Sequence, residues 1–117
     1  MTENRVTNVM LIGRNQWVID AAERELTSPQ RAVYGAVTMA ELEAVLTENR
    51  IDHAFVGPGL DLDLRMELIR RVFELTDSTT VHLKDFSHGP EGALAFVEAI
   101  LTGLEALDAT ARPVPRK

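Results

Sequence analysis

The chain has 117 residues and a mass of 13.0 kDa, the size of one domain with a core of its own. It contains no cysteine, which excludes disulfide scaffolds, cysteine nucleophiles and thiolate-bound metal clusters. Its 12 basic and 18 acidic residues give a formal net charge of −6. A globule this acidic repels phosphate backbones, so we expect no nucleic-acid partner.

The apolar runs are far shorter than the roughly 20 residues that a membrane span requires, so we expect no membrane partner. The first residues also lack the charged-then-apolar pattern of a signal peptide. Together these observations favour a cytoplasmic location.

Four short apolar runs, at residues 6–12, 32–37, 54–56 and 79–83, predict strands. Gly13 closes the first run and Gly57 closes the third, as turn residues should. The runs lack a strict alternation of apolar and polar residues, which is typical of parallel strands covered on both faces.

An amphipathic segment follows each strand. The first helix is expected over residues 16–26 with Asn15 as its N-cap, and the second begins at a capping box formed by Thr38 and Glu41. A third helix follows Asp61, and a fourth begins near residue 90 and carries an apolar stripe from Leu94 to Leu107.

Four strand–helix units in succession predict a three-layer α/β/α domain with a four-stranded parallel sheet in the order 2-1-3-4. We expect this (βα)4 domain to span residues 1–108. Residues 109–117 hold two prolines, three basic residues and no apolar stripe, which predicts a loose basic C-terminal tail.

In such a sheet every strand-to-helix turn falls on one edge, and ligands bind there because helix N-termini point their amides at that edge. The candidate ligand-binding residues in these turns are Arg14, Asn15, Gly57, Gly59, Lys84, Asp85 and His88. Arg14 and Lys84 would pair with an anion held by the amides near Asn15. The alternative is that these are ordinary solvated turn residues.

The turns do not predict catalysis. The first turn has one glycine where a dinucleotide fingerprint needs three, and the lysine-containing phosphate loop is absent, so we expect no cofactor. The aspartates Asp61 and Asp63 favour helix capping over cation binding, and Ser87 or Asp85 favours an N-cap over a nucleophile. We therefore expect no metal site and no catalytic residue.

The last unit carries a family resemblance. Residues 81–86, Val-His-Leu-Lys-Asp-Phe, followed by an apolar helix, resemble the final strand, lysine, aromatic residue and helix of the receiver domain of bacterial response regulators. This likeness implies a flavodoxin-like topology, which is Rossmann-like in its alternation of strands and helices, and Lys84 matches the lysine that contacts the phosphoryl group. The chain departs from the family at Gly57, where receivers carry the phosphorylated aspartate, and at Asp85, where they carry proline. It also lacks the acid pair after the first strand and one of the usual five units.

The sequence thus favours a non-catalytic regulatory or protein-interaction module with a degenerate receiver-like fold, which is not phosphorylated at the usual position. We expect a homodimer, because an open sheet leaves two edge strands that need cover. A different protein partner could cover them in the same way. Phe96 and Ala99 lie away from the main stripe of the last helix and suggest a second apolar face for the partner copy.

The alternative is a protein or enzyme that binds a phosphate- or carboxylate-bearing metabolite, a nucleotide or a flavin at the C-terminal edge of the sheet. Arg14, Asn15 and Lys84 would hold the anion, and Asp85 or His88 would act as acid–base.

Overall fold

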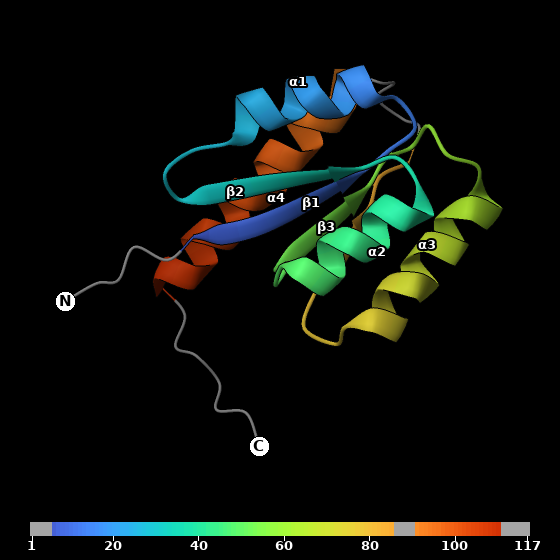
Figure 1. Cartoon of the computed structure of the whole chain (residues 1–117). Coiled ribbons are helices and arrows are strands. Elements are labelled where there is room, and N and C mark those ends of the chain that lie inside the picture. The colour runs from blue at the N-terminus through green and yellow to red at the C-terminus, as the bar shows by residue number, and fades with distance from the viewer. Residues whose placement is uncertain (1–5, 86–90, 111–117) are drawn as a thin grey trace.

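Four parallel strands form one sheet in the order β2-β1-β3-β4, which confirms the predicted topology. The computed structural model describes residues 6–85 and 91–110. Its elements are β1 (Thr7–Ile12), α1 (Gln16–Leu26), β2 (Arg31–Ala36), α2 (Met39–Glu48), β3 (His53–Val56), α3 (Leu62–Leu75), β4 (Thr80–Leu83) and α4 (Glu91–Thr110). Helices α1 and α4 cover one face of the sheet, and α2 and α3 lie side by side on the other (Figure 1). The arrangement is the flavodoxin-like three-layer fold.

The side chains of β1 alternate between two cores. Met10 and Ile12 point toward α2 and α3, where they pack with residues such as Leu42 and Val72. Val9 and Leu11 belong to the core under α1 and α4. Because β1 hydrogen-bonds to β2 on one side and β3 on the other, it is enclosed on all four sides. This explains the unbroken apolar run in the sequence.

Side chains at the helix starts fulfil most of the predicted capping. Thr38 accepts a hydrogen bond from the Glu41 amide at 3.1 Å, and Asp61 accepts one from the Leu64 amide at 3.0 Å. The Glu41 carboxylate accepts from the Val37 N–H at 2.7 Å, one residue earlier than in a standard capping box. Asn15 is the N-cap residue of α1, but its side chain makes no cap hydrogen bond.

Two expectations for the last helix need correction. Phe96, expected on a second apolar face, packs edge-on against Phe55 with ring centroids 6.1 Å apart, so it is partly buried against the core under α4. Helix α4 also extends to Thr110, two residues into the predicted tail, and the rest of that tail lies outside the described residues. Ala99 is exposed, as expected.

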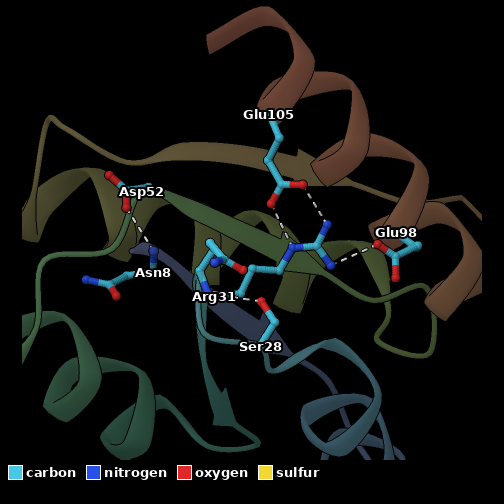
Figure 2. A network of polar contacts seen from close by, with 7 residues as sticks. Asn8, Ser28, Arg31, Asp52, Glu98 and Glu105 are labelled. Carbon is cyan, nitrogen blue, oxygen red and sulfur yellow. Dashed lines mark hydrogen bonds and ion pairs between the residues drawn. The ribbon is translucent and has the colours of Figure 1, made fainter. Parts of the chain in front are cut away.

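An ion-pair network joins the start of β2 to α4 (Figure 2). The Arg31 guanidinium donates from Nε and Nη2 to both carboxylate oxygens of Glu105, at 2.7 and 2.8 Å, and from Nη1 to Glu98 at 2.8 Å. The two glutamates are seven residues apart and therefore lie on one side of the helix. The hydrogen bond from Arg31 lowers the pKa of Glu105, although partial burial acts in the opposite direction.

We predict that Glu105→Gln lowers the free energy of unfolding at neutral pH by about 0.5–1 kcal/mol, since the paired groups remain partly in solvent. Because the pKa of Glu105 is lower in the folded chain, its contribution is present above its ordinary pKa and disappears as the pH falls below that value. The variant should therefore lose less stability than the wild type between about pH 5 and pH 3. Urea unfolding at several pH values measures both effects. Glu25→Gln, at an exposed position of α1, is the control. If the free energies of unfolding of the wild type and of Glu105→Gln change with pH in parallel, the pH dependence does not come from Glu105.

Candidate functional site

The ends of the strands form a common rim. The Gly13 amide donates to Ala36 at 3.1 Å and the Gly57 amide to Ile12 at 2.9 Å, and the Lys84 amide donates to Val56 at 3.3 Å. Gly13, Gly57 and Lys84 therefore each extend their strand by one position at the carboxyl edge of the sheet. The structure thus brings the three predicted turns together at the backbone level.

The side chains of the candidate residues do not gather around one point of the rim. Arg14, Asn15 and Asp85 are exposed. A Cβ at Gly57 would lie 3.3 Å from the carbonyl oxygen of Ile12, so glycine serves close packing there, whereas a Cβ at Gly59 would meet nothing within 4 Å. His88 lies outside the described residues. Within the described part of the chain, no hydrogen bond or ion pair joins the Arg14 side chain to Lys84.

Lys84 is the most buried of the candidates that the structure describes, at 6% exposure. Its Nζ lies 2.8 Å from Asp85 Oδ1 and 5.8 Å from the centroid of the Phe96 ring. A buried ammonium must keep such partners, because desolvation of an isolated charge is costly. Lys84 therefore has a structural role between the rim and α4.

Arg65 of α3 approaches the same strand end from the other face of the sheet. It is 8% exposed, and its Nη1 donates to the Lys84 carbonyl at 3.2 Å. Sequence reasoning missed this residue, although a signal was available: Asp61, Arg65, Leu68 and Val72 follow helical spacing, so Arg65 falls on the inward face.

A rim cavity of about 220 Å³ lies between the starts of α2 and α3. Its lining is mostly apolar and consists of Ile12, Gly13, Val37, Thr38, Met39, Leu60, Leu64, Glu67 and Leu68. None of the predicted ligand-binding residues that the structure describes contributes to it. It is also smaller than the roughly 300–1,000 Å³ of ordinary small-molecule sites, and the one ionisable group among its described lining residues, Glu67, is a carboxylate, which disfavours anions.

Two histidines meet on the α4 face of the sheet, which sequence reasoning did not foresee. His82 Nε2 lies 3.3 Å from His53 Nδ1, and the His82 ring stacks on Phe55 with a centroid separation of 4.6 Å. The pairing register, which sets Phe55 beside His82, brings them together. Burial lowers the pKa of His82, and the nearby charge of His53 lowers it further.

A flank of α3 and the neighbouring edge of the sheet carry exposed apolar side chains. Leu62, Met66 and Phe73 are 58%, 43% and 55% exposed. They are spaced with the half-buried Ile69 at i, i+4, i+7 and i+11, which places all four on one flank of the helix. Leu83, at the end of β4, is 41% exposed.

This flank faces away from α2. The opposite flank of α3 contacts α2, because Arg71 Nε lies 2.7 Å from Glu43 Oε2, and Leu64 and Met39 line one cavity. The exposed flank therefore looks toward β4, the edge strand, and the hydrogen bond from Arg65 to the Lys84 carbonyl agrees with this. We call the set Leu62, Met66, Ile69, Phe73, Val81 and Leu83 the α3–β4 surface.

No family model, no curated protein and no solved structure matches this chain. In the described ranges, 6–85 and 91–110, no helix is long and apolar enough to span a membrane. The same residues contain no group of three or more histidine, aspartate or glutamate side chains placed to hold a metal ion.

We predict that the His82 contact makes stability depend on pH near neutrality. The pKa of His82 is lower in the folded chain, so its neutral form stabilises the fold above the ordinary histidine pKa of about 6.5, and this contribution is lost as the pH falls toward the lowered value. The variant His82→Gln should therefore lose less stability than the wild type on going from about pH 7.5 to 5.5. Urea unfolding at the two pH values measures the difference. If both proteins lose the same stability between the two pH values, His82 is not the cause of the pH dependence.

Proposed function

We propose that the chain is a non-catalytic protein-interaction module that docks a polypeptide on its α3–β4 surface. The observation that carries this proposal is the exposure of Leu62, Met66 and Phe73 along one flank of α3. Single exposed apolar residues are common, but a contiguous group of large ones marks an interaction surface.

The inward face of α3 already supplies what the monomer needs. Leu68 and Val72 are 4% and 0% exposed and complete the core under α2 and α3. Among the residues that the structure describes, nothing covers Met66 or Phe73, and a second polypeptide docked on this flank would bury both. Methionine suits such a surface because its flexible, polarisable side chain adapts to a partner.

The rim supports a non-catalytic role. Its buried lysine is engaged by Asp85, and its turn after β3 carries Gly57 in place of an acid. Under the likeness to receiver domains, which is part of this proposal, Gly57 occupies the usual phosphorylation position and offers no carboxylate. A regulatory role would then operate through docking and not through phosphoryl transfer.

We predict that a photo-reactive amino acid in place of Met66 forms covalent products with a protein in cells that naturally express the chain. The physical reason is proximity, since Met66 lies in the middle of the α3–β4 surface. The same amino acid in place of Arg24, an exposed residue of α1 on the opposite layer, is the matched control. Gel electrophoresis and mass spectrometry identify the products. Equal yields at the two positions, or none at Met66, would contradict the proposal.

The competing function is the binding of a small anion at the rim, and the position of Lys84 beside the first and third turns favours it. The chain's one tryptophan, Trp17, lies exposed in the first turn of α1 near Arg14 and Asn15 and so reports on this region. We predict that inorganic phosphate and nucleoside phosphates change neither Trp17 fluorescence nor the melting temperature. A saturable response that Arg14→Ala abolishes would establish the anion site in place of the interaction module.

A further inference from the structure

The outer edge of β4 offers backbone groups to another strand. The amides of Thr80 and Lys84 donate inward, to Asp52 and Val56. Since backbone groups alternate in direction along a parallel strand, those of Val81 and Leu83 point outward, away from β3. An extended segment that pairs with β4 would satisfy them.

The strand lacks the usual protection against such pairing. Natural edge strands are commonly blocked by charged residues or by proline, whereas β4 reads Thr-Val-His-Leu. The opposite edge strand, β2, begins with Arg31, which α4 holds through two glutamates. The two edges are therefore not equivalent, and β4 is the edge that no described residue blocks.

The backbone edge and the apolar flank form one continuous surface. Val81 and Leu83 pair in register with Ala54 and Val56, which belong to the core under α2 and α3. Their side chains therefore point to the same face of the sheet as α3. A partner that pairs with β4 would at once be placed beside the exposed flank of α3.

A second copy of this chain matches both parts of the surface. A two-fold axis perpendicular to the sheet sets β4 antiparallel to its own copy and brings the two α3 helices side by side, also antiparallel. Each apolar stripe then packs against the other stripe, and each edge strand covers the other.

The charges beside the stripe are also self-complementary. Asp63 and Arg70 are exposed, seven residues apart and on the same side of α3, one before and one after the middle of the stripe near Met66. In an antiparallel pair of helices, Asp63 of one copy comes opposite Arg70 of the other, and the two-fold axis repeats the contact. A parallel arrangement would instead oppose like charges.

We infer that two copies associate through their α3–β4 surfaces, with antiparallel pairing of β4 to form one sheet of eight strands, four from each copy. The inference rests on the proposed function and names its partner. It also replaces the expectation of a dimer through Phe96, whose ring packs against the core.

The first test is the oligomeric state of the full chain, measured by sedimentation equilibrium. We expect a wild-type dimer that Met66→Glu weakens at least about 30-fold, the factor that corresponds to the roughly 2 kcal/mol of an interface hot spot. Leu107→Glu, at an α4 residue as exposed as Phe73, should leave the dimer intact. Circular dichroism verifies that both variants are folded. A wild-type monomer at the highest soluble concentration, or a dimer insensitive to Met66→Glu, would overturn the inference.

The second test uses the charge pair and does not depend on the apolar side chains. Asp63→Arg and Arg70→Asp should each weaken the dimer, because each opposes like charges across the two-fold axis. An equimolar mixture of the two variants should form a mixed dimer that is tighter than either variant alone. Native mass spectrometry distinguishes the species, with one variant isotopically labelled. A mixture with no preference for the mixed dimer would overturn the antiparallel arrangement.

Failure of this inference can be told apart from failure of the proposed function. A monomeric chain whose Met66 position cross-links to a different protein overturns the homodimer and leaves the interaction module in place. A monomer that cross-links to no protein overturns both.

Discussion

The central strand β1 constrains the whole molecule, because it is buried from every direction. Val9 and Met10 point to opposite faces of the sheet and both have 0% exposure. A strand that is apolar on both faces requires helices on both faces, and right-handed connections place α2 and α3 on one side and α1 on the other. No strand follows α4, which packs beside α1 on the core of that face. The same constraint collects all strand-to-helix turns at one rim and leaves β2 and β4 as edges. The rim and the open edge are thus consequences of how this strand is buried.

The two edge strands differ in how firmly the rest of the monomer holds them. At β2, glycine at position 35 lets α1 approach closely, since a Cβ there would clash with Ile19, and Arg31 anchors the strand to α4. At β4, no comparable cover of the outward backbone groups or of the α3 flank is found within residues 6–85 and 91–110. This difference between the two edges is the basis for placing the proposed docking at β4.

Local signals were sufficient to predict the elements from the sequence. The apolar runs, the Thr38 cap and the Asp61 cap depend on residues close in the chain, and strand order follows from general rules of chain connection. The pairing of His53 with His82 was missed because it is long-range and depends on strand register. Helical spacing placed Arg65 on the inward face of α3, but its hydrogen bond to the Lys84 carbonyl depends on how α3 packs on the sheet. Phe96 was misplaced for the same reason, because successive helix positions differ by about 100° and a small rotation moves a ring from solvent to core.

At the candidate site, too, the sequence predicted where the backbone lies but not where the side chains point. The backbones of Gly13, Gly57 and Lys84 are aligned as topology requires, yet topology does not orient the Arg14 and Lys84 side chains toward a common ligand. The ammonium of Lys84 sits beside Asp85 and the Phe96 ring, so its charge is already balanced inside the fold. An anion would have to displace a carboxylate that is covalently part of the chain and only one residue away. In the proposed docking at the α3–β4 surface, apolar side chains would leave water and outward backbone groups of β4 would gain partners, and no carboxylate among the described residues would have to be displaced. This difference is the reason for proposing the interaction surface ahead of a rim ligand.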